Sequence, residues 1–246
     1  MRIVIVSVDT EITLQEVQKC IFNMKKGKAS GFDNIPSEVI RSVHVKYFLV
    51  NLFNKCFNSG SIPDIWNKSI IVPIPKCYSK DIRDPTNTRG LSVASAVYKL
   101  YCAILNMRLE KFDDECDVIV DEQNGFKKKR SCVDHLISLT SIIETRKQLK
   151  RSTFVAYIDF RRAYDGIRRE KLWFKLEKLG FTADSKFLQA VKSLYNNVMC
   201  SVRLKGLLSD WFDVNVGLKQ GCLISPALFN IYINDLACKI KELDKG

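Results

Sequence analysis

A short apolar run that ends in an acid most constrains how this chain can fold. Residues 154–167 read FVAYIDFRRAYDGI, and the residues before Asp159 are mostly apolar and strand-like. A carboxylate at the end of a buried strand is costly unless it is paired or holds a metal ion. Asp165 follows, with an aromatic residue, Tyr164, directly before it. The pattern predicts a strand over residues 153–159 whose terminal acid is either a metal ligand or a helix N-cap.

The net charge of the chain indicates which class of molecule it is expected to bind. The 246 residues include 39 Lys and Arg against 27 Asp and Glu, a net charge of +12. Such an excess favours a polyanion, most simply nucleic acid, although a solvated basic surface is the plainer alternative. The length suits one large domain or two small ones.

Cysteine usage and hydropathy indicate a protein of the cell interior, in the nucleus, the cytoplasm or both. None of the nine cysteines forms a Cys-x-x-Cys pair, and His44 and His135 are the two histidines, so the spacing of a zinc site is absent. Free thiols in a reducing compartment are therefore expected. No run reaches the roughly 18 apolar residues of a membrane helix, so we expect no membrane partner. The opening MRIVIVSVDT is either a strand or an artefact of where the reading frame begins, and residues 1–12 stay unassigned.

Periodicity predicts one α+β unit with helices packed on a modest sheet. Thr13 and Glu16 form a capping box at the start of a helix, and Ser59-Gly60 ends a second helix. The expected helices span residues 13–24, 36–57, 91–112, 135–149, 168–179, 183–196 and 222–236. The expected strands span residues 69–75 and 153–159, with a hairpin of 199–204 and 211–216.

A second segment carries chemistry of its own. Residues 217–235 read GLKQGCLISPALFNIYIND. Gly221 removes a side chain where backbone can approach a ligand, and Gln220 supplies a hydrogen-bonding amide. Ser225-Pro226 then begins a helix with an apolar face, so an ordinary loop-to-helix junction is the alternative.

Together these two segments resemble motifs A and B of reverse transcriptases, specifically those of non-LTR (LINE-type) retrotransposons. The resemblance implies a right-hand polymerase fold with fingers and palm. It implies that Asp159 is catalytic and binds Mg²⁺, with Mn²⁺ as a substitute, and that the backbone carbonyl of Phe160 binds the second ion. Tyr164 would pack under the sugar of the incoming dNTP, or else belong to the core, and Gln220 and Gly221 would contact the nucleotide.

Upstream segments extend the resemblance over roughly residues 13–240. KASGFDNIPSEVI (28–40) resembles the segment before the fingers, and IIVPIPK (70–76) with NTRGLSV (87–93) resembles the fingers strands. There Lys76 and Arg89 would face the triphosphate, because a guanidinium fork matches phosphate oxygens. The family's usual tyrosine and proline around that arginine are replaced by Thr88 and Gly90.

A basic turn completes the set of candidate residues. QNGFKKKRSCVDHL (123–136) resembles the next block of the family. Four consecutive cations there would suit the backbone of an RNA template paired with a DNA primer, or form a solvated charged turn. They are Lys127, Lys128, Lys129 and Arg130.

The resemblance stops short of the family's motif C, an aromatic-x-Asp-Asp hairpin. The acids after Pro226 are Asp235, Glu242 and Asp244, and none are adjacent. We therefore expect a truncated reverse transcriptase without a thumb. Its parts would be a helical extension (13–68), fingers (69–150) and a palm with an incomplete sheet (151–246).

The expected function is that of a fragment of an RNA-directed DNA polymerase. Such an enzyme adds dNTPs to a primer on an RNA template by two-metal nucleotidyl transfer, and this chain would be inactive alone without motif C. Two alternatives stay open: a non-catalytic, RNA-binding retroelement remnant, and a protein resembling group II intron maturases.

Overall fold

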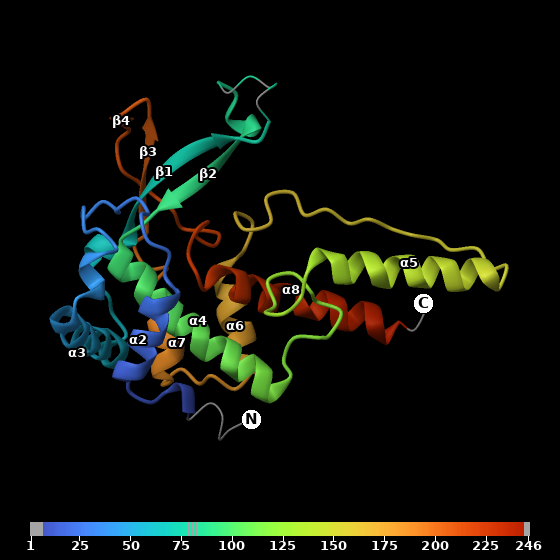
Figure 1. Cartoon of the computed structure of the whole chain (residues 1–246), viewed down its shortest axis with the longest axis horizontal. Coiled ribbons are helices and arrows are strands. Elements are labelled where there is room, and N and C mark those ends of the chain that lie inside the picture. The colour runs from blue at the N-terminus through green and yellow to red at the C-terminus, as the bar shows by residue number, and fades with distance from the viewer. Residues whose placement is uncertain (1–6, 78, 80, 82, 244–246) are drawn as a thin grey trace.

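The computed structural model describes residues 7–77, 79, 81 and 83–243 and has a mixed sheet above a body of helices (Figure 1). The sheet has five strands in the order β2-β1-β3-β4, and β5 also pairs with β3. This arrangement confirms the α+β class. Any strand at the start of the chain falls mainly on residues outside the described ranges.

The sheet is built around β1 (Lys68–Pro75). It pairs antiparallel with β2 (Thr88–Val93), with Ile70 opposite Val93, and parallel with β3 (Met199–Leu204). The predicted strand 69–75 is therefore confirmed. The predicted hairpin is only partly correct, because β3 pairs with two short strands, β4 (Leu207–Leu208) and β5 (Phe212–Asp213), in place of one strand over 211–216.

Two N-terminal helices follow the local rules closely. Helix α2 (Leu14–Asn23) begins at the predicted capping box, in which Thr13 and Glu16 satisfy each other's backbone amides. Helix α3 (Val43–Ser59) ends at Gly60, whose φ of 63° is the left-handed geometry of a helix C-terminus. The predicted start at residue 36 is wrong, because a separate 3₁₀ turn (Val39–Arg41) precedes α3.

Helix α4 (Ala96–Cys116) is the centre of the core. Its side chains Tyr98, Tyr101 and Phe112 are fully buried among residues of α3 and of the later helices. The predicted start at residue 91 is wrong because residues 88–93 form β2, and Ser95 caps the helix instead.

The remaining body helices are α6 (Arg169–Lys178), α7 (Lys186–Ser193) and α8 (Ser225–Glu242). Helix α6 contacts α8, and α7 packs against α3 and α6. Pro226 lies in the first turn of α8, where its missing amide hydrogen costs no helical bond. Within residues 7–77, 79, 81 and 83–243, no helix combines the length and the hydropathy needed to cross a bilayer.

Helix α5 (Cys132–Gln148) projects from the body, and the chain then returns alongside it as an irregular segment (Figure 1). The predicted strand over residues 153–159 is wrong: these residues have no regular secondary structure, and Phe154 is 96% exposed and Tyr157 85% exposed. A strand requires hydrogen-bonded neighbours, and none of the described strands pairs with this segment. The apolar pattern therefore faces outward.

Candidate functional site

An open cleft of about 1100 Å³ lies between the sheet and the body. Three separate segments line it: residues 76, 85, 86 and 88–91; residues 159–165; and residues 219–222, 225 and 226. Seven of the residues predicted to bind metal or nucleotide line this one cleft. They are Lys76, Arg89, Asp159, Phe160, Tyr164, Gln220 and Gly221.

The first wall is the end of β1 and the start of β2. The Lys76 ammonium donates a hydrogen bond of 2.8 Å to the Thr86 carbonyl oxygen, which holds it at the cleft edge. Arg89 lies opposite Ile74 in the strand register, and no described residue forms an ion pair with its guanidinium. Both cations are therefore presented by a hydrogen-bonded ribbon and available to an anion.

The second wall is the loop of residues 159–165. The Asp159 carboxylate has no hydrogen bond or ion pair with any described residue. Asp165 accepts a hydrogen bond of 3.2 Å from the Gln220 amide. Among the described residues Asp165 forms no ion pair with an arginine, and Arg169 turns into the protein interior.

The Tyr164 side chain packs against two aromatic rings. Its ring lies 5.2 Å from that of Phe229 in α8 and 6.3 Å from that of Phe126, measured between centroids. Burial raises the pKa of the Tyr164 hydroxyl. Phe160 also meets Phe229, at 6.4 Å and nearly edge-on. The ring of Tyr164 is thus held at the cleft by two aromatic neighbours.

The third wall is residues 217–224, here called the Gln-Gly loop. Gly217 has a φ of 82°, and a Cβ there would lie 2.9 Å from the Tyr164 carbonyl oxygen. Gly221 has a φ of 101°, and a Cβ there would lie 2.9 Å from the Ser92 carbonyl oxygen. Both positions require glycine for conformation and for space. The Leu218 amide donates 3.0 Å to the Tyr164 carbonyl, so the second and third walls are joined.

A buried arginine anchors the Gln-Gly loop from behind. Arg169 of α6 donates hydrogen bonds to the carbonyl oxygens of Gly217 (3.0 Å), Tyr195 (2.9 Å) and Val214 (2.9 Å). It is 7% exposed, and burial lowers the pKa of its guanidinium. The sequence did not indicate this role, because residues distant in the chain supply the acceptors.

A buried polar cluster also lies behind the loop. The Lys219 ammonium lies 4.7 Å from the Tyr98 ring centroid and 3.5 Å from the Asn67 side-chain oxygen. Burial lowers the pKa of Lys219. Ser225 donates to the Lys219 carbonyl oxygen at 2.9 Å and lies 3.0 Å from the Tyr195 hydroxyl. This network fixes the loop at the start of α8, and nothing in the local sequence marks it.

The basic cluster of residues 127–130 lies outside the cleft. Three of its members face acids: Lys127 lies 3.9 Å from Asp113, Lys128 pairs with Glu110, and Arg130 lies 3.1 Å from Asp121. Lys129 makes no ion pair with a described residue and has a positive φ of 61°. A role for these cations on a template stays a prediction.

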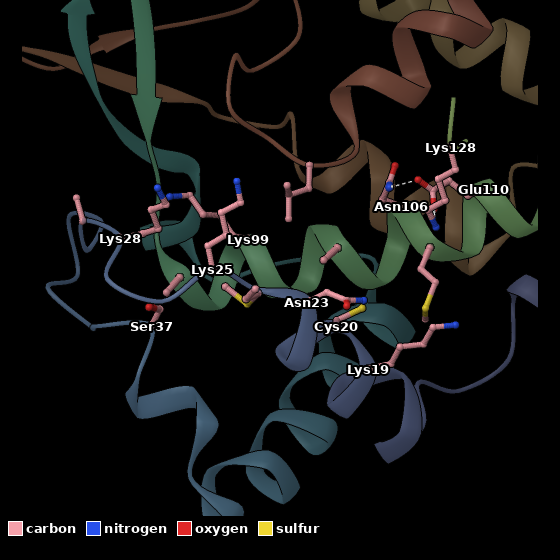
Figure 2. A pocket seen from close by; sticks show the side chains of 16 residues that line it. Lys19, Cys20, Asn23, Lys25, Lys28, Ser37, Lys99, Asn106, Glu110 and Lys128 are labelled. Atoms are coloured by element: carbon pink, nitrogen blue, oxygen red, sulfur yellow. Dashed lines mark hydrogen bonds and ion pairs between the residues drawn. The ribbon is translucent and has the colours of Figure 1, made fainter. Parts of the chain in front are cut away.

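A second pocket, of about 450 Å³, lies between α2, the loop after it and α4 (Figure 2). Its walls are largely apolar and include Met24, Ala103 and Met107. Figure 2 shows lysines at both ends, with Lys99 near one and Lys128 beside Glu110 at the other. None of the seven cleft residues reaches this pocket.

The donors in the cleft partly fit a magnesium ion. Mg²⁺ takes oxygen ligands from one or two carboxylates, supplemented by water and substrate phosphates. Asp159 offers an unpaired carboxylate, and Phe160 follows it with a backbone carbonyl. Within the described part of the chain no group of three or more His, Cys, Asp or Glu side chains could hold a metal ion. These oxygen donors suit an ion that a phosphate-bearing substrate also binds. The protein alone does not supply a complete set of ligands.

Comparison with known proteins identifies the family of the chain. Residues 74–244 match the family described as reverse transcriptase (RNA-dependent DNA polymerase). The chain is 25% identical over 229 residues to a probable RNA-directed DNA polymerase from transposon BS of Drosophila melanogaster, covering 92% of this chain and 25% of the relative. It is 25% identical over 232 residues to a Pol polyprotein from a type-1 retrotransposable element R2 of Popillia japonica, covering 94% of this chain and 31% of the relative.

A third relative is the RNA-directed DNA polymerase from mobile element jockey of Drosophila melanogaster, 24% identical over 227 residues, with 92% of this chain and 24% of the relative covered. The chain thus spans about a quarter to a third of the length of these relatives. The chain belongs to the reverse transcriptase family and is related to the polymerases of non-LTR retrotransposons.

Proposed function

We propose that this chain forms the nucleotide-binding part of an RNA-directed DNA polymerase site. One observation carries the proposal: the cleft gathers the cations Lys76 and Arg89, a free carboxylate and a glycine-containing loop from three distant segments. Apart from the buried Lys219, the cleft lining holds four cationic side chains against two acidic ones, an excess that suits a triphosphate. In this assignment strands β1 and β2 belong to the fingers (69–150), and the Gln-Gly loop belongs to the palm (151–246).

Lys76 and Arg89 bind the phosphates of the incoming dNTP in this proposal. Arg89 presents a planar fork that matches two phosphate oxygens, whereas Lys76 acts as a point charge. The Asp159 carboxylate and the Phe160 carbonyl would hold Mg²⁺, which would neutralise phosphate charge and activate the attacking hydroxyl. The RNA template and the DNA primer lie across the open face of the cleft.

Tyr164 selects the sugar by bulk. The contacts with Phe126 and Phe229 hold its ring beside the nucleotide site. A 2′-hydroxyl would meet that ring, which favours deoxyribonucleotides over ribonucleotides. Gln220 and Gly221 shape the opposite side, and the hydrogen bond from Gln220 to Asp165 keeps this amide directed into the cleft.

A non-catalytic, RNA-binding role is the second candidate. The number of possible metal ligands favours this role. Asp159 is the one free carboxylate among the described cleft residues, and two-metal chemistry needs more than one carboxylate. We therefore expect the 246 residues alone to bind a nucleotide without extending a primer. Template-dependent extension that disappears in Asp159→Ala would contradict this expectation.

Nucleotide binding provides the direct test. Calorimetry should detect dATP binding that requires Mg²⁺ and weakens at least tenfold in Arg89→Ala, because the guanidinium loses a charge-assisted contact of about 1.5–3 kcal/mol. Arg83→Ala is the matched control, since Arg83 is exposed, pairs with Asp81 and lies outside the cleft. Equal affinities in the two variants would remove Arg89 from the site.

A further inference from the structure

Two thiols face each other behind the cleft. Cys102 of α4 and Cys222 of the Gln-Gly loop have sulfur atoms 3.5 Å apart, although 120 positions separate them in sequence. A disulfide needs a sulfur–sulfur distance of about 2.05 Å, so the sulfurs must approach by roughly 1.5 Å. Such a movement is within reach of side-chain rotation and a small shift of the loop.

The surroundings favour the ionised form of one of the two thiols. The Tyr98 hydroxyl donates a hydrogen bond of 3.4 Å to the Cys222 sulfur. The hydrogen bond between the two thiols, the bond from Tyr98 and the nearby Lys219 ammonium together lower the pKa of Cys222 despite its burial. A thiolate is the nucleophilic form of cysteine, so Cys222 is the more reactive partner.

The cleft provides access to this thiol. Cys222 belongs to the lining of the cleft and is 6% exposed, whereas Cys102 is fully buried behind it. A small electrophile that enters the cleft therefore meets Cys222 first. The arrangement has the two parts that thiol oxidation requires, an attacking thiolate within reach of solvent and a second thiol poised to react with the product.

We propose that Cys222 is an oxidation site for hydroperoxides and that Cys102 is its resolving thiol. The Cys222 thiolate attacks the terminal peroxide oxygen, the O–O bond breaks, and the alkoxide leaves as an alcohol after taking a proton. The sulfur of Cys102 then attacks the sulfur of the Cys222 sulfenic acid, the S–O bond breaks, and water leaves. Overall, two thiols and one hydroperoxide give one disulfide, one alcohol and one water.

The disulfide would tie the Gln-Gly loop to α4. It would hold Cys222, the residue after Gly221, against the core helix and shift the sulfur that Tyr98 now contacts. Oxidation thus acts on the wall of the cleft without involving Asp159 or Arg89.

Peptide mapping under non-reducing conditions tests the proposal. The reduced protein is treated with tert-butyl hydroperoxide in a Cys77→Ser, Cys132→Ser background, which removes the two exposed thiols. A cross-linked peptide pair containing Cys102 and Cys222, lost on treatment with dithiothreitol, is expected. Cys56 is the internal control, because it is buried and burial raises its pKa to about 11, so it should stay reduced.

A second variant separates the two chemical steps. In Cys102→Ser the sulfenic acid has no resolving thiol, so dimedone should label Cys222 several-fold more than in the parent protein. The proposal is overturned if Cys102 and Cys222 are both fully alkylated on unfolding of the treated parent protein. It is also overturned if Cys222 and Cys56 are labelled equally in Cys102→Ser.

Discussion

Replacement of Gly217 by alanine should destabilise the protein through contact between two segments of backbone. The new Cβ would lie 2.9 Å from both the Asp165 Cα and the Tyr164 carbonyl oxygen, which are backbone atoms that cannot rotate away. The glycine also has a φ of 82°, a backbone conformation that residues with a side chain rarely adopt. The substitution therefore combines conformational strain with a steric overlap.

Gly206 separates these two effects. Its φ of 86° is close to that of Gly217, yet a Cβ there meets no atom within 4 Å. The left-handed conformation alone costs roughly 1–2 kcal/mol, which is the expected loss for Gly206→Ala. Overpacking adds about 1–3 kcal/mol, so Gly217→Ala should lose about 2–5 kcal/mol.

Urea unfolding followed by tryptophan fluorescence measures both free energies, and equal slopes confirm that the two variants unfold alike. A difference between Gly217→Ala and Gly206→Ala below about 0.5 kcal/mol would refute the steric argument. It would mean that residues 159–165 and the Gln-Gly loop separate without loss of stability.

Three further predictions concern the residues that support the site. Arg169→Met should lower the free energy of unfolding by about 3–5 kcal/mol, because the substitution leaves buried carbonyl oxygens without donors. Arg168→Met, at an exposed position, should change the free energy of unfolding by less than about 0.5 kcal/mol in the same urea titration. Burial alone would raise the pKa of the Glu16 carboxyl, but hydrogen bonds from Arg108 and the backbone lower it from its ordinary value. The pair therefore stabilises the fold above the ordinary pKa of a glutamate and loses this effect as the pH falls through the lowered pKa of Glu16, so the urea midpoint should fall with acidification more in the parent protein than in Glu16→Gln. Sedimentation velocity should show self-association of the parent protein that Ile158→Ser reduces, because the apolar segment around it is exposed; an unchanged distribution of species would contradict this.

Local rules account for much of the fold. The capping box at Thr13, the glycine stop at Gly60 and the apolar strand β1 depend on residues close in sequence, and all three appear where the pattern indicates. The predicted start of α4 at residue 91 is wrong, because Leu91 and Val93 fit the apolar spacing of a helix as well as that of a strand. Pairing with β1 decides in favour of the strand, and that pairing is not visible in the segment itself.

The support of the site depends on tertiary contacts that no local pattern reveals. Arg169 reads as one of several cations at the start of a helix, and only the folded chain surrounds it with carbonyl oxygens. Lys219 likewise reads as an ordinary loop cation, yet it lies against Tyr98 in the core. The residues facing the cleft were found through short motifs, whereas the residues behind it had no such signal.

The segment before Asp159 explains why the strand prediction failed and what that means for the site. Hydrogen bonds connect Tyr164 to Leu218 and to Ile167, but residues 154–161 form none with the described part of the chain. The nearest contact that restrains the position of Asp159 is the ring contact between its neighbour Phe160 and Phe229. Fixing the backbone of each residue costs roughly 1–2 kcal/mol, so a ligand that needs Asp159 in one position must offset that ordering. A neighbouring strand paired with residues 153–159 would order this segment in advance and strengthen metal and nucleotide binding without adding any contact to the ligand.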